Sequence, residues 1–119
     1  MSDVVAPSGQ VLIVGTGLIG TSVGLALRSA GSQVWLDDRD ADALTTAITR
    51  GAGERITDDI RPELVVVAVP PLAVAGVVAD VLARYPEATV TDVCSVKALP
   101  LARLRAMVDD VSRFVGSHP

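Results

Sequence analysis

Short apolar runs alternate with longer amphipathic stretches along most of this chain. Valine, leucine and isoleucine dominate the short runs, whereas the longer stretches repeat apolar positions at helical spacing, and glycine or proline separates many of the segments. The pattern predicts strands over residues 10–14, 33–37, 54–56, 64–69, 89–92 and 113–115. It predicts helices over residues 18–30, 41–50, 71–84 and 96–108.

Strands that alternate with helices imply right-handed crossovers and therefore a parallel sheet. Six strands are the full count for a doubly wound dinucleotide-binding fold, in which the strand order is 3-2-1-4-5-6. We therefore predict an α/β, Rossmann-like fold with a doubly wound parallel sheet. Ligands of such sheets bind beyond the carboxyl ends of the strands, so the residues that follow each strand are the first candidates for a functional site.

Length and composition agree with this prediction. A chain of 119 residues is expected to form one domain, residues 1–119. Half of the residues are hydrophobic but only 3% are aromatic, so the core must consist of Val, Leu, Ile and Ala. This composition suits strands that are buried on both faces, as in parallel sheets.

Charge and targeting signals narrow the class of protein. The net charge of −4 argues against a nucleic-acid or anionic-membrane surface. The apolar stretch 64–79 is cut by Pro70 and Pro71, and its pieces are too short to cross a bilayer. Cys94 is the only cysteine, which excludes an intrachain disulfide and fits a reducing compartment. The first ten residues lack the features of a signal peptide, so we expect a cytoplasmic protein. Separately, we predict no metal site.

The segment VLIVGTGLIGTSVG carries the strongest functional signal. Gly15, Gly17 and Gly20 form a G-x-G-x-x-G pattern between a predicted strand and a predicted helix. The first glycine permits a tight turn, the second permits close approach of a diphosphate, and the third lets the helix pack on the strand. The amino end of that helix favours an anion. We therefore expect cofactor contacts from the whole turn, which comprises Gly15, Thr16, Gly17, Leu18, Ile19 and Gly20.

An acidic pair follows the second predicted strand. Asp38 lies 18 residues after Gly20, where a ribose-binding carboxylate is expected in this fold. Such a carboxylate accepts hydrogen bonds from the ribose hydroxyls and repels a 2′-phosphate, which favours NAD over NADP. Asp37 is the alternative, and both acids could instead lie in a solvated turn. Arg39 is a candidate for adenine stacking or simple solvation.

Three further sites follow predicted strands. Val69 and Pro70 would lie beneath a bound cofactor, although an ordinary strand-to-helix turn explains them equally well. Ser95 could cap a helix or hold a polar group of a substrate. His118 is the only histidine, and it could either accept a proton from an alcohol or lie in a solvated tail.

Five segments together resemble the cofactor domain of the prephenate and arogenate dehydrogenases of tyrosine biosynthesis. They are GTGLIGTSVGLALR, LDDR, VVVAVPP, TDVCSVKA and VGSHP, and the last two are the most specific. The resemblance covers residues 11–119. It implies oxidative decarboxylation, in which the ring carbon that bears the 4-hydroxyl loses hydride to NAD and loss of CO2 aromatises the ring.

The resemblance also implies roles for two residues and the existence of a second domain. Neutral His118 would accept the hydroxyl proton, and Ser95 would bind the same hydroxyl and orient His118. Members of the family have a helical domain after the GSHP segment, which mediates homodimerisation and completes the site for prephenate or arogenate. Because the sequence stops at Pro119, we expect that domain to lie outside it and the isolated chain to be inactive.

A mean hydropathy of +0.48 suggests a surface that a partner domain would cover, and so predicts self-association.

The main alternative function is a non-catalytic NAD-binding module that senses redox state or regulates another domain.

Overall fold

The computed structural model describes residues 9–93 and 114–116. These residues form a six-stranded sheet in the order β3-β2-β1-β4-β5-β6, and all neighbouring strands are parallel. The strands are β1 (Gln10–Val14), β2 (Gln33–Asp37), β3 (Glu54–Arg55), β4 (Pro62–Val67), β5 (Thr89–Asp92) and β6 (Phe114–Gly116). The helices are α1 (Leu18–Ser29), α2 (Ala41–Thr49) and α3 (Pro71–Arg84). The predicted fold class and strand order are confirmed.

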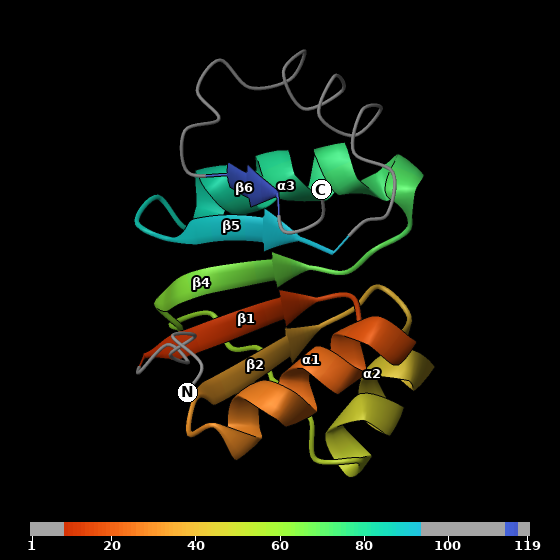
Figure 1. The fold of residues 1–119 in the computed structure, drawn as a ribbon. Helices are drawn as coiled ribbons and strands as arrows, with labels where there is room; N and C mark the ends of the chain where they lie inside the picture. The colour runs from red at the N-terminus through yellow and green to blue at the C-terminus, as the bar shows by residue number, and fades with distance from the viewer. Residues whose placement is uncertain (1–8, 94–113, 117–119) are drawn as a thin grey trace.

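The sheet is buried on both faces, as its apolar strands require. Successive residues of β1 point to opposite faces, so Leu12 and Ile13 belong to different core clusters. The cluster with Ile13 includes residues of α2, and α1 packs against it. The cluster with Leu12 includes residues of α3. Figure 1 accordingly shows α1 and α2 beside β1 and β2, and α3 beside β5. The buried apolar residues in the described part are all Val, Leu, Ile or Ala, as the composition predicts.

Local signals set the helix ends. The side chain of Asp40 accepts hydrogen bonds from the amides of Asp42 (3.0 Å) and Ala43 (3.2 Å), which caps α2. Gly31 follows α1 with a φ of +99°, a backbone conformation that disfavours residues with a Cβ atom. The predicted bounds of these two helices are therefore correct to within one residue.

Three strand predictions are wrong at their ends. The predicted strand 64–69 is β4 at residues 62–67, because Pro62 can begin a strand without an amide donor and Val69 already belongs to the turn into α3. The last strand is shifted by one residue, to 114–116, and β3 is one residue shorter than expected. The predicted helix 96–108 lies outside the described residues.

All neighbouring strands are parallel, and the labelled arrowheads in Figure 1 point to the same edge of the sheet, where α1 and α3 both begin. At this carboxyl edge, the turns after β1, β2 and β4 come together. Within residues 9–93 and 114–116, no helix is long and apolar enough to cross a membrane. The same residues contain no group of three or more side chains placed to hold a metal ion.

Candidate functional site

The turn between β1 and α1 depends on two glycines for its shape. Gly15 has a φ of +103°, and a Cβ atom at this position would overlap the backbone oxygen of Ala68. A Cβ atom at Gly20 would overlap the backbone oxygen of Gly15 and lie 3.0 Å from its carbonyl carbon. Backbone cannot move aside as a flexible side chain does, so the fold itself requires glycine at both positions.

Gly17 differs from these two glycines. Its φ of −69° is accessible to any residue, and a Cβ atom there would meet no atom within 4 Å. Neither the backbone conformation nor the packing therefore requires glycine at this position. Open space at a helix N-terminus, where backbone amides are unpaired, is what a diphosphate needs for close approach.

Asp38 reaches from the end of β2 to this turn. Its Oδ2 atom accepts hydrogen bonds from the amide (2.6 Å) and the hydroxyl (2.7 Å) of Thr16, and its Oδ1 atom accepts one from the amide of Asp40 (2.8 Å). By contrast, Asp37 contributes its backbone oxygen, which accepts from the Gly15 amide at 2.8 Å. The structure thus brings the carboxylate of Asp38 to the glycine-rich turn through both of its bonds to Thr16.

These contacts keep Asp38 ionised. Burial alone would raise the pKa of the carboxyl group, but hydrogen bonds from the Thr16 and Asp40 amides and from the Thr16 hydroxyl outweigh it. The pKa of Asp38 is therefore lower than its usual value of 3.8. A negative charge is fixed at the mouth of the turn at neutral pH.

Because the folded chain has the lower pKa, ionised Asp38 stabilises the fold at any pH well above 3.8. That contribution is lost as the pH falls through the depressed pKa. We expect urea unfolding to show a constant stability difference between the natural chain and Asp38→Asn from pH 7 to about pH 5, and a shrinking difference in more acidic buffer. A difference that grows on acidification would contradict the lowered pKa.

The other predicted contact residues in the described part also lie near the carboxyl edge. Leu18 and Ile19 begin α1 with exposed side chains, and Pro70 precedes α3. Val69 is half-buried against the core on the α3 side of the sheet. Arg39 is exposed and lines a cleft of about 150 Å³ with Asp37 and the facing side of α3.

Two predicted residues, Ser95 and His118, lie outside the described residues. Sequence reasoning assigned no role to two others near the carboxyl edge. The hydroxyl of Thr21 donates to the backbone oxygen of Thr16 at 3.0 Å, within a buried part of the turn. Asp92 is fully buried at the end of β5, and its position as an acid that closes an apolar strand was the available signal.

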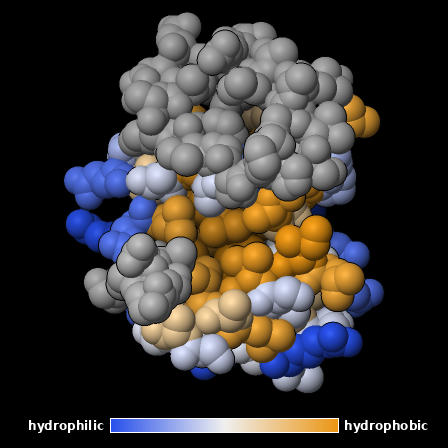
Figure 2. Space-filling view, in the orientation of Figure 1, coloured by the Kyte–Doolittle hydropathy of each residue, from blue (hydrophilic) through white to orange (hydrophobic). Residues whose placement is uncertain are grey.

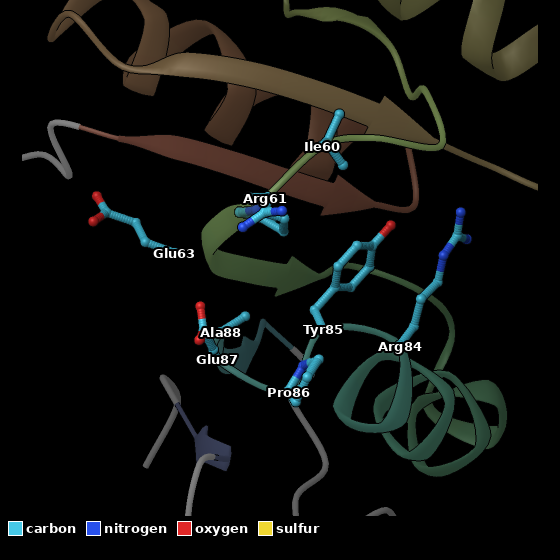
Figure 3. Close-up of a pocket in the computed structure, with 9 residues that line it drawn as sticks. Ile60, Arg61, Glu63, Arg84, Tyr85, Pro86, Glu87 and Ala88 are labelled. Atoms are coloured by element: carbon cyan, nitrogen blue, oxygen red, sulfur yellow. The ribbon is translucent and has the colours of Figure 1, made fainter.

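A larger cavity, of about 390 Å³, lies at the opposite edge of the sheet. It is lined by residues 60–63, which include the first two residues of β4, and by residues 84–88, which run from the end of α3 to β5. Figure 3 shows the Tyr85 ring in the middle of this group, with Arg61 and Arg84 on either side. Since ligands of parallel sheets bind at the carboxyl ends of the strands, this cavity is not part of the candidate site.

Apolar side chains are exposed beside the candidate site. Leu18 is 82% exposed, Ile19 58% and Leu72, in the first turn of α3, 68%. Figure 2 shows a hydrophobic area across the centre of the face on which α1 lies, with polar residues to its left and right. Exposed apolar surface of this kind favours association.

We therefore expect the average mass measured by light scattering to rise with protein concentration. Replacing Leu72 with Gln is expected to weaken this association, whereas Leu25→Gln, further along α1 where the side chain is 41% exposed, is expected to weaken it less. A concentration-independent monomer would contradict the prediction.

Comparison with known proteins places the chain in a family. Residues 23–119 match the family described as prephenate dehydrogenase, nucleotide-binding domain. The chain belongs to this family. A protein of Streptomyces niveus named "Probable prephenate dehydrogenase NovF" is 42% identical over 108 residues, which are 91% of this chain and 30% of that protein. This member of the prephenate dehydrogenase family thus spans about a third of the length of the curated relative that it matches.

Solved structures of the prephenate dehydrogenase family share the fold. A prephenate dehydrogenase of A. aeolicus, crystallised with hydroxyphenyl propionate and NAD+, has a TM-score of 0.79 at 28% identity, and the match covers 93% of this chain and 41% of that one. An arogenate dehydrogenase of Synechocystis has a TM-score of 0.77 at 25% identity, with 92% and 40% covered. The family resemblance expected from the sequence motifs is confirmed.

Proposed function

We propose that this chain is the NAD-binding part of a prephenate or arogenate dehydrogenase. The observation that carries the proposal is the pair of short hydrogen bonds by which Asp38 meets the glycine-rich turn, at 2.6 and 2.7 Å from Thr16. The diphosphate and the adenosine ribose are polar parts of NAD that a binding site must recognise. The glycine-rich turn offers a place for the diphosphate, and the Asp38 carboxylate offers an acceptor for the ribose hydroxyls.

The residues present fit NAD on two counts. First, the space in front of Gly17 is open for a diphosphate. The fold itself does not require glycine at this position, so a ligand is what would explain it. Second, the Asp38 carboxylate is ionised, and its Oδ1 atom takes no part in the two bonds from Thr16, so this is the oxygen placed to accept a ribose hydroxyl. A 2′-phosphate at the same place would meet this negative charge, so we propose that NAD is preferred to NADP.

Bound NAD supplies a hydride acceptor. We propose that His118 accepts the proton of the substrate 4-hydroxyl, which requires a neutral imidazole, and that Ser95 binds the same hydroxyl. Loss of CO2 from the ring then gives an aromatic product. The family resemblance supports these two roles. It also supports two further proposals: a second, helical domain that forms a homodimer, and a cytoplasmic location.

Titration of the chain with NAD and with NADP tests the proposal. We expect saturable binding of NAD, with NADP bound at least about tenfold more weakly, which corresponds to the loss of one charge-assisted hydrogen bond and the gain of a repulsion. Equal affinity, or a preference for NADP, would remove the ribose role of Asp38. Absence of binding to both would overturn the proposed function.

Turnover provides a separate test. We expect no dehydrogenase activity from residues 1–119 alone with prephenate or arogenate, because half of the substrate site is expected to lie in the second domain. In a chain that includes this second domain, His118→Asn is expected to lower kcat by about 100-fold or more and to leave NAD affinity nearly unchanged. Unchanged kcat would rule out proton transfer to His118.

A further inference from the structure

Thr16 lies in the middle of the glycine-rich turn, yet its polar groups point into the protein. The residue is only 4% exposed. Both of its donors, the amide and the hydroxyl, are bound to the Oδ2 atom of Asp38, and its backbone oxygen accepts from the buried hydroxyl of Thr21. A threonine has no further N–H or O–H to donate. As the structure stands, Thr16 can therefore donate no hydrogen bond to a ligand.

The consequence for Asp38 is an unequal use of its two oxygens. Oδ2 accepts both hydrogen bonds from Thr16, which fills its usual capacity, whereas Oδ1 accepts the Asp40 amide; the backbone of Arg39 also bonds to the carboxylate. A ribose hydroxyl would therefore be accepted by Oδ1. Turning the plane of the carboxylate about the Cβ–Cγ bond would break both contacts with Thr16, so Thr16 fixes the direction in which the other oxygen faces.

We propose that Thr16 is a positioning residue that sets the preference for NAD over NADP by holding the Asp38 carboxylate in place. This inference rests on the proposed function, because it assigns a task to Asp38 within the NAD site. The Thr16 hydroxyl is the part of the arrangement that the side chain supplies. The hydrogen bond from the Thr16 amide depends instead on the backbone of the turn. That backbone is held by the hydroxyl of Thr21 and by the hydrogen bond from the Gly15 amide to the Asp37 oxygen.

Thr16→Val tests this role, because valine has the shape of threonine but no hydroxyl. A hydrogen bond to a charged group is typically worth a factor of about ten or more in an equilibrium constant, so we expect Kd for NAD to rise about tenfold. We expect Kd for NADP to change by less than about threefold, because the freed carboxylate can turn away from a 2′-phosphate and so loses part of its repulsion. The ratio of the two constants is the readout, since general damage to the turn would weaken both cofactors alike.

Two matched variants complete the set. Thr16→Ser keeps the hydroxyl and is expected to retain the natural ratio to within about twofold. Thr57→Val removes a similar bond, from the Thr57 hydroxyl to Asp59 at 2.6 Å, in an exposed segment that is not part of the glycine-rich turn. It is expected to change neither constant. If Thr16→Val does not fold, Thr16→Ala makes the same test with a smaller side chain and the same expected loss of preference.

The outcomes separate the two claims. If the natural chain binds neither cofactor, the proposed function fails. If it binds NAD without preferring it to NADP, the ribose role of Asp38 fails, and the role of Thr16 falls with it. If the natural chain prefers NAD and Asp38→Asn abolishes that preference, but the Thr16 variants without a hydroxyl keep it, the inference about Thr16 alone is overturned. Carbon-13 NMR of the Asp38 carboxyl gives a second readout: its pKa is expected to rise in Thr16→Val and to stay unchanged in Thr57→Val.

Discussion

Replacing Gly17 with alanine is expected to leave the fold intact and to abolish measurable NAD binding. The added methyl group would meet no protein atom within 4 Å, and the backbone there already has an ordinary φ of −69°. Gly17 is the N-cap of α1 without a side-chain cap, so the substitution is expected to change the free energy of unfolding by about 1 kcal/mol or less. The methyl group would occupy the space that a diphosphate needs, and we expect Kd for NAD to rise at least about 100-fold.

Two further glycine substitutions control this experiment. Gly20→Ala would force a Cβ atom onto the backbone oxygen of Gly15, so we expect a loss of about 3 kcal/mol or more, or no folded protein. Gly76→Ala lies in α3, where a Cβ atom also meets open space. It is expected to stabilise the helix by about 0.5–1 kcal/mol and to leave NAD affinity unchanged. If Gly17→Ala bound NAD as the natural chain does, the space in front of Gly17 would not be the diphosphate site.

Asp38→Asn is expected to have the second largest effect, on the choice between the two cofactors. The amide has the size of the carboxylate but no charge, and its nitrogen cannot accept the bonds that Thr16 now donates. We expect Kd for NAD to rise about 30- to 100-fold and Kd for NADP to change little or to fall, because the repulsion of the 2′-phosphate is removed. Isothermal titration calorimetry with both cofactors measures the change.

Asp37→Asn is the matched control for Asp38→Asn. Asp37 is the neighbouring acid, but its contact with the glycine-rich turn runs through its backbone oxygen, which the substitution leaves in place. We therefore expect the preference for NAD to survive in Asp37→Asn. A loss of preference in this variant, with Asp38→Asn unaffected, would exchange the roles that we assign to the two acids.

Most of the sheet could be predicted because its signals are local. Apolar runs bounded by glycine or proline identify buried parallel strands, and Asp40 and Gly31 mark helix ends by chemistry that acts within a few residues. The run from residue 64 to residue 69 misled the prediction because Val69 is apolar for a different reason. It packs on the core from a turn rather than from a strand, and hydropathy alone does not distinguish the two.

The candidate site could be predicted only as a set of residues at the carboxyl ends of strands. Spacing selected Asp38, but no pattern showed that its carboxylate would bind both donors of Thr16, because that contact joins residues 22 apart across two strand ends. For the same reason, Thr16 was predicted simply as part of a cofactor-binding turn. Its position within a network that includes Thr21 depends on side-chain directions, which spacing does not determine.

The central claim, that the carboxyl edge between the glycine-rich turn and Asp38 holds the cofactor, can be tested most directly by two-dimensional NMR of the labelled chain during NAD titration. We predict that the largest amide shift changes occur at Thr16 to Gly20 and at Asp38 and Arg39. Amides around the larger cavity at the opposite edge, such as those of Arg61 and Glu87, are expected to stay unchanged. Shift changes confined to that cavity, or none at saturating NAD, would contradict the account.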